Sequence, residues 1–101
     1  MPDETELQID RIDAADTVKA TVVVRCLRGP VRLGARFHRI RGAADAIDLE
    51  LTNIVCYGRP VGELDASHTA IVTLRGTGAR HLTPGTPADG WQVIRGTNPP
   101  P

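Results

Sequence analysis

The sequence predicts an all-β domain, either a sandwich or a barrel, from three observations. Short runs are rich in β-branched residues, turn residues separate those runs at regular intervals, and no stretch between turns leaves room for a long helix. The 101 residues include ten glycines and eight prolines spread along the chain. That length suits one compact domain. Because aromatic residues are scarce, we expect a core of Val, Leu, Ile and Ala.

Six segments are expected to form the strands. In chain order they are residues 7–13, 17–27, 35–42, 46–57, 69–76 and 90–96. The first reads LQIDRID, the second is the Val-rich run TVKATVVVRCL, and the fifth and sixth are the short β runs TAIVTLRG and GWQVIRG. In the fourth, Ile47, Leu49 and Leu51 alternate with polar residues, which indicates one buried face.

The third expected strand, 35–42, lies within a stretch of six arginines without an acid, RCLRGPVRLGARFHRIRG at 25–42. We interpret this stretch as a hairpin with Val31 and Leu33 pointing inward and Arg32 outward. Phe37 and Ile40 would anchor the second strand, and their spacing of three predicts a bulge or a strand end. The arginines would take the outward positions, and the turns are expected at 28–30, 42, 58–60, 65–67, 76–78 and 83–85.

The ends of the chain are expected to lie outside the folded domain. We predict a flexible N-terminus at 1–6, one domain at 7–95 and a disordered Pro-rich tail at 96–101. The N-terminus is acidic and has no apolar core of a signal peptide, and no apolar run approaches the roughly 20 residues of a membrane span. A cytoplasmic protein with no membrane contact is the expectation, with Cys26 and Cys56 as reduced core thiols.

Several segments together resemble one family of domains. The segment RGPVRLGARFHRI resembles the part of translation GTPases where a strand ends in Arg-Gly and an apolar-basic-apolar triplet follows. ELDASHTAIVTLRG resembles a later turn and strand of the same domain, PGTPADGWQVI its closing strand, and LQIDRIDAADTVKATVVVRCLRG its opening strands. The resemblance is to the second domain of elongation factor Tu and its relatives, and it spans about residues 7–95. It implies a small closed antiparallel β-barrel of about six strands, present as a stand-alone unit.

Two segments depart from that family. The usual Ala-Gly-Asp turn is replaced by ASHT at 66–69, and TPADG at 86–90 lengthens the approach to the last strand. These changes bear on contacts at the end of the barrel more than on the fold.

The sequence contains no pattern that predicts catalysis or a cofactor. No phosphate-binding G-x-x-x-x-G-K-[ST] motif occurs, so no nucleotide is expected to bind. The histidines are not spaced with the cysteines as zinc ligands are, so neither a metal nor another cofactor is expected. Ser67 beside His68 suits a turn better than a nucleophile and its base. We therefore expect a protein that is not an enzyme.

Two functions remain as hypotheses. In the first, the arginines bind RNA phosphates, and the chain contacts RNA or ribosome-associated components, as the family's barrels do. The candidate contact residues are Arg28, Arg32, Arg36, Arg39 and Arg41, with His68 in the replaced turn. In the second, the chain is a protein–protein or self-association module with no nucleic-acid role.

Two observations weigh against a basic binding patch. Formal net charge is zero, and six acids within residues 1–24 could form cross-strand ion pairs with the arginines. Eleven of the twelve basic residues are Arg, a bias that genome composition explains as well as ligand recognition does.

Overall fold

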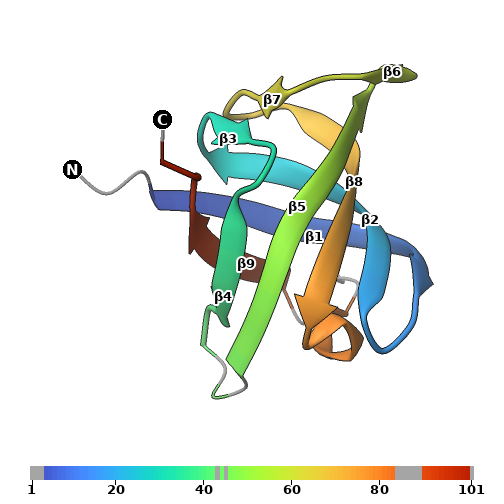
Figure 1. Cartoon of the computed structure of the whole chain (residues 1–101), viewed down its shortest axis with the longest axis vertical. Coiled ribbons are helices and arrows are strands. Elements are labelled where there is room, and N and C mark those ends of the chain that lie inside the picture. The colour runs from blue at the N-terminus through green and yellow to red at the C-terminus, as the bar shows by residue number, and fades with distance from the viewer. Residues whose placement is uncertain (1–3, 43, 45, 84–89, 101) are drawn as a thin grey trace.

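Six long antiparallel strands form the body of the molecule in the computed structural model, which describes residues 4–42, 44, 46–83 and 90–100 (Figure 1). Three two-residue strands and one turn of 3₁₀ helix complete the described part. The elements are β1 (Glu4–Ala15), β2 (Lys19–Arg28), β3 (Val31–Arg32), β4 (Arg36–Ile40), β5 (Ala46–Cys56), β6 (Arg59–Pro60), β7 (Glu63–Leu64), β8 (Thr69–Thr77), η1 (Ala79–His81) and β9 (Gln92–Thr97).

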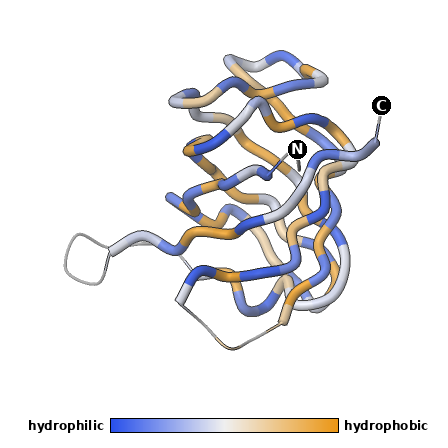
Figure 2. Tube along the Cα trace, turned by 90° about the vertical axis from the view of Figure 1, so that its left-hand side faces the viewer, coloured by the Kyte–Doolittle hydropathy of each residue, from blue (hydrophilic) through white to orange (hydrophobic). Residues whose placement is uncertain are grey.

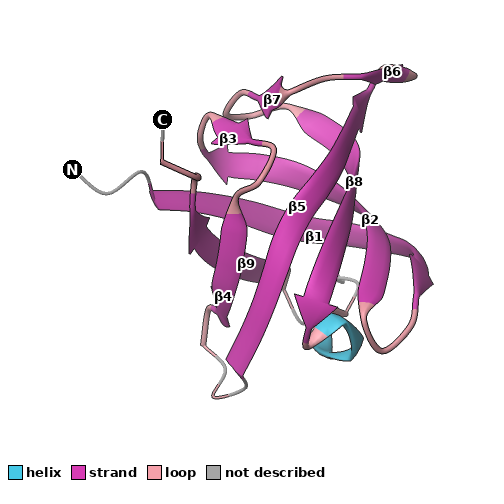
Figure 3. Ribbon diagram, viewed as in Figure 1, coloured by secondary structure: helices cyan, strands magenta, loops and turns pink. Residues whose placement is uncertain are grey.

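The long strands close into a barrel in the order β1–β2–β8–β5–β4–β9. Closure depends on β4, which pairs with β5 on one side and with β9 on the other, while β9 pairs with β1. The short β6 only extends the hairpin of β5, and β3 pairs with β7 in a separate two-stranded sheet. The predicted closed antiparallel barrel of about six strands is therefore confirmed, and η1 is the only helical element of the described chain (Figure 3).

The core is aliphatic because each long strand turns alternate residues inward. Hydrophobic and hydrophilic residues alternate along the strands in Figure 2, and β5 buries Ile47, Leu49 and Leu51 as predicted. Phe37 is the one aromatic residue among the fully buried side chains of the described chain. Leu82, just after η1, also joins the core cluster.

Bulges and close backbone contacts curl the sheet into a closed shape. The register of β4 shifts between Phe37 and Arg39 against both of its neighbours, so Phe37 and Ile40 are both buried, as their spacing predicts. Where β9 crosses β4, a Cβ placed on Gly96 would lie 2.0 Å from the carbonyl oxygen of Arg36. On the β5–β8 side, Gly76 meets Asp48 in the same way.

The predicted hairpin over residues 25–42 is wrong. Strand β2 pairs with β1 and β8, whereas β4 pairs with β5 and β9, so two strands separate β2 from β4 in either direction around the barrel. The chain leaves β2 at Gly29, forms β3 against β7, and only then enters β4. The arginines of this stretch consequently belong to different sides of the barrel.

One inward assignment in the same stretch is also wrong. Val31 is buried as predicted, but Leu33 is 40% exposed. The alternation of β3 ends at Arg32 because a turn follows, with Gly34 at a φ of 90°. The Leu33 amide donates to the Gly62 carbonyl at 3.1 Å, which fixes the backbone and leaves the side chain outside.

Both expected domain boundaries need correction. Residues 4–6, expected in a flexible terminus, belong to β1, because Glu4 and Thr5 pair with Thr97 and Gly96 of β9. Gly96 and Thr97, expected in a disordered tail, are therefore the end of the closing strand. Residues 1–3 and 101, most of the turn expected at 83–85, and most of the extension at 86–90 lie outside the described residues.

Candidate binding surface

Basic side chains gather where β4 and β9 lie side by side, a surface that we call the β4–β9 seam. Strand β4 turns Arg36, His38 and Arg39 outward, because its bulge lets two consecutive residues face solvent. Arg95 on β9 is the direct cross-strand partner of Arg39. Arg41 follows β4, and its backbone amide donates to the Val93 carbonyl at 2.8 Å. The seam thus consists of Arg36, His38, Arg39, Arg41 and Arg95.

Ion pairs neutralise part of the seam. The guanidinium of Arg36 lies 3.3 Å from carboxylate oxygens of both Asp48 and Glu50 on β5. The Nε of Arg95 lies 3.0 Å from the carboxylate of Glu6 on β1. Within the described part of the chain, no carboxylate forms an ion pair with Arg39 or Arg41. Those two guanidiniums are therefore the seam's uncompensated charge.

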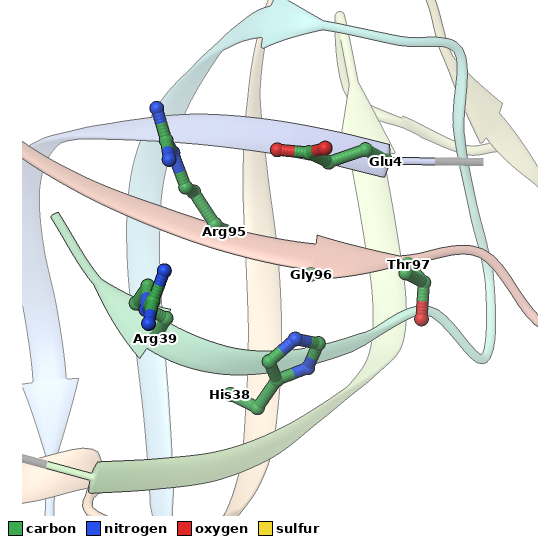
Figure 4. Close-up of a pocket in the computed structure, with 6 residues that line it drawn as sticks. All are labelled: Glu4, His38, Arg39, Arg95, Gly96 and Thr97. Atoms are coloured by element: carbon green, nitrogen blue, oxygen red, sulfur yellow. The ribbon is translucent and has the colours of Figure 1, made fainter. Parts of the chain in front are cut away.

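A hollow of about 490 Å³ opens on this surface. Figure 4 shows the side chains that line it: Glu4 from β1, His38 and Arg39 from β4, and Arg95, Gly96 and Thr97 from β9. In that view the carboxylate of Glu4 is turned toward Arg95. The hollow therefore lies across three strands that the chain brings together only when the barrel closes.

Arg28 and Arg32 belong to a second hollow, of about 420 Å³, at the end of the barrel where β2 stops. It is lined by Glu4, Arg28, Gly29, Pro30, Arg32, Glu63 and Asn98. Arg28 is exposed, and its Nη1 lies 3.7 Å from the carboxylate of Glu4. Glu4 lines both hollows, so a negative charge lies between Arg28 and the seam.

The residues after β9 fold back over β3 and engage Arg32. The side-chain oxygen of Asn98 accepts the Arg32 backbone amide at 2.9 Å, and its nitrogen donates to the Pro30 carbonyl at 2.8 Å. A terminal nitrogen of Arg32 donates to the Pro99 carbonyl at 3.2 Å. Arg32 therefore holds Asn98 and Pro99 against β3.

His68 lies apart from the seam, in the turn before β8. The Cys26 amide donates to its carbonyl at 2.8 Å, which ties the turn to β2, while the imidazole is exposed. Arg25, the first arginine of the basic stretch, faces outward on the same strand. The structure thus brings together three of the six predicted contact residues, Arg36, Arg39 and Arg41, and places Arg28, Arg32 and His68 elsewhere.

Sequence reasoning missed Arg95 and Thr97, although it did expect acids near the N-terminus to form cross-strand ion pairs with arginines, as Glu4 and Glu6 do. A signal was present, because Arg-Gly occurs at 28–29, 41–42, 75–76 and 95–96, each time after an apolar residue near a strand end. In the last of these, alternation with the buried Ile94 and Gly96 turns Arg95 outward. Its pairing with Arg39 could be inferred only from the closed topology.

A different face of the barrel carries an apolar row. Val23 of β2, Ile71 of β8, Val55 of β5 and Pro60 of β6 are successive cross-strand partners on the outer surface. Ile71 is 39% exposed, and Tyr57 in the neighbouring hairpin turn is 94% exposed. This row lies on β2, β8, β5 and β6, across the barrel from β9.

The thiols and the acidic groups form no metal centre in the described part of the chain, where no cluster of three or more His, Cys, Asp or Glu residues occurs. Cys26 is buried as expected, and burial raises the pKa of its thiol to about 11. Cys56 is partly buried, and its sulfur lies 3.7 Å from the Thr69 carbonyl oxygen. No described helix is long and apolar enough to cross a membrane.

Comparison with known proteins gives a likeness in fold. No protein-family model matches the sequence, and no curated protein matches it. Two solved structures of translation elongation factor SelB from Methanococcus maripaludis, the apo form and the complex with the GTP analogue GppNHp, superpose with a TM-score of 0.70. Each match covers 94% of this chain at 14% identity. The chain spans about a fifth of SelB, since the match covers 19% of that chain.

Proposed function

We propose that this chain is a non-catalytic binding module that contacts RNA or an RNA-containing component of translation through the β4–β9 seam. The fold is that of a barrel in a translation elongation factor, and it accounts for nearly all of the chain. The observation that carries the proposal is the seam itself. Arg39 is the cross-strand partner of Arg95, Arg41 follows at the end of β4, and neither Arg39 nor Arg41 forms an ion pair in the described part of the chain.

The charge pattern supports contact with phosphates rather than recognition of bases. Arginines on a rigid strand bind the RNA backbone with an affinity that falls as salt rises and varies little with sequence. Of the exposed aromatic residues in the described chain, Tyr57 lies at the hairpin of β5 and β6 and Trp91 directly precedes β9, and neither lines the hollow on the seam. Among the described residues, the lining of the hollow therefore offers no Phe, Tyr or Trp as a stacking platform of the kind used by single-strand binders.

The test is binding to bulk tRNA and to ribosomes at about 50 and 200 mM salt, because phosphate contacts weaken steeply over that range. The double variant Arg39→Gln/Arg41→Gln should bind far more weakly and reduce the salt slope by about two, close to one unit for each phosphate that an arginine neutralises. The matched control is Arg25→Gln/Arg59→Gln, which removes two exposed arginines from β2 and β6. No binding at the lower salt, or equal weakening in both variants, would contradict the proposal.

The apolar row favours a second candidate function, self-association or docking on a protein. Four apolar residues in register on an outer sheet face are typical of a contact surface more than of a solvated one. Sedimentation velocity over a range of protein concentrations tests this candidate, with Ile71→Lys as the variant. A protein that stays monomeric at every concentration would contradict self-association, and an assembly unaffected by Ile71→Lys would place it elsewhere.

A further inference from the structure

The hollow between β4, β9 and β1 has the charge arrangement of an anion site. Arg39 and Arg95 are direct cross-strand partners on one face of the sheet. Like charges in that position destabilise a sheet, so the pair carries a cost in the absence of a ligand. An anion between the two guanidiniums would convert that repulsion into two charge-assisted contacts.

Neighbouring acids leave the charge of this hollow incompletely neutralised. Glu6 contacts Arg95 along its Nε edge at 3.0 Å. Glu4 lines the hollow, but its carboxylate also lies 3.7 Å from Arg28. Arg39 has no ion pair in the described part of the chain. The guanidinium of Arg39 is therefore the group to which an incoming anion would be drawn.

Polar side chains other than arginine also line the hollow beside the Arg39 guanidinium. The bulge of β4 places His38 next to Arg39 on the outer face, and Thr97 contributes a hydroxyl from the neighbouring strand. Gly96 lies between them without a side chain, so the backbone forms the floor of the hollow (Figure 4). Donors from two strands suit a tetrahedral oxyanion with several acceptor oxygens.

We propose that this hollow is a phosphate site, in which Arg39 is the principal contact and Arg95, His38 and Thr97 complete the donor set. The inference rests on the proposed function for one source of the phosphate, the RNA backbone. A free phosphate or phosphate ester offers the same chemistry, and the experiment separates the two sources.

The probe is inorganic phosphate, added to the full chain at constant ionic strength with chloride as the balancing anion. Amide chemical shifts of β4 and β9 should move together and saturate, with a dissociation constant on the order of 1 mM. Arg39→Gln should weaken binding about tenfold, as expected when a charge-assisted contact is removed. Glu4→Gln should tighten binding, because it removes a carboxylate from the lining.

The matched control is Arg25→Gln, which removes one exposed arginine from β2, three positions away from β4 around the barrel. Binding should change less than about twofold, since only long-range screened charge is removed. Equal weakening by Arg25→Gln and Arg39→Gln would overturn the proposal. Shifts that never saturate, or that acetate reproduces at the same ionic strength, would also overturn it.

A stability measurement makes the result independent of RNA. In phosphate-free buffer Arg39→Gln should melt at the same temperature as the parent or higher, because the repulsion with Arg95 is gone. Phosphate should raise the melting temperature of the parent but not that of the variant. A fall in the variant's melting temperature without phosphate would show that Arg39 serves the fold instead.

The same variants distinguish the two proposals. Saturable phosphate binding without any RNA affinity would refute the proposed function and leave this site as one for a free phosphate or phosphate ester. RNA affinity with no saturable phosphate binding would refute the site and leave the proposed function standing. Loss of both in Arg39→Gln alone would assign the RNA phosphate to this hollow.

Discussion

Gly96 should be the least replaceable glycine on the strands that close the barrel. It pairs with Thr5 of β1 on one side and with Phe37 of β4 on the other. A Cβ at this position would lie 2.0 Å from the carbonyl oxygen of Arg36 and 2.7 Å from the Cα of Phe37. Both atoms are backbone, so a side-chain rotation cannot relieve the clash.

The cost of Gly96→Ala follows from that geometry. Separating the Cβ from the carbonyl to an ordinary contact of about 3.3 Å requires β4 and β9 to move apart by more than about 1 Å. Neighbouring strands hold a spacing of about 4.8 Å, so such a shift breaks ladder hydrogen bonds worth about 1 kcal/mol each. With the strain of overpacking, a decrease in stability of about 3 kcal/mol is expected.

The assay is equilibrium unfolding in urea, followed by the fluorescence of Trp91 and by circular dichroism. The matched control is Gly62→Ala, because a Cβ at Gly62 meets no atom within 4 Å and its φ is not in the left-handed region. That variant should change stability by less than about 0.5 kcal/mol, or stabilise slightly through the unfolded chain. If Gly96→Ala fell within about 1 kcal/mol of this control, close backbone packing at Gly96 would be refuted as a condition of barrel closure.

Three further predictions concern single side chains. Cys56 should react with a thiol reagent in the native protein at pH 8 while Cys26 stays protected, because burial raises the pKa of the Cys26 thiol to about 11; equal native rates would contradict this. Asp16 accepts hydrogen bonds from the Val18 and Lys19 amides at 2.8 Å, which lowers the pKa of its carboxyl from its ordinary value. Asp16→Ala should therefore lower the free energy of unfolding at neutral pH, and the difference should vanish as the pH falls through the lowered pKa; a difference that persists in acid would contradict it. Arg36→Ala should lower the free energy of unfolding by less than about 1 kcal/mol despite its two ion pairs, since exposed pairs contribute little; a larger decrease in a urea titration would assign the pair a structural role.

The sequence was informative where the physics is local. Alternation in residues 46–57 identifies the buried face of β5, because the side-chain period of a strand is two. The three-residue spacing of Phe37 and Ile40 indicates the bulge of β4, because both side chains can reach the core only if the register shifts between them. These inferences need no knowledge of which strands are neighbours.

The candidate surface was harder to predict because it depends on distant pairing. Arg39 and Arg95 are 56 positions apart in the sequence and become partners only through closure of the barrel. Six neighbouring arginines at 25–42 suggested a continuous patch, but β3 carries the chain across the end of the barrel and separates β2 from β4. Charge density along a sequence is thus a poor guide to charge density on a closed sheet.

The Arg-Gly pairs connect the stability of the barrel with its surface chemistry. In β8 and in β9, glycine occupies a position where a Cβ would strike the backbone of the neighbouring strand, and the preceding arginine faces outward. Arg75 then lies between Glu50 of β5 and Lys19 of β2, and Arg95 lies between Arg39 of β4 and Glu6 of β1, so each arginine has one unlike and one like cross-strand neighbour. At the β4–β9 seam the Nε of Arg95 lies 3.0 Å from the carboxylate of Glu6, so Arg39 is the guanidinium of this pair that has no ion pair in the described part of the chain. Because closure fixes Gly96, the position of Arg95 is fixed with it, and the charge on the facing β4 residue is what decides whether this surface attracts an anion.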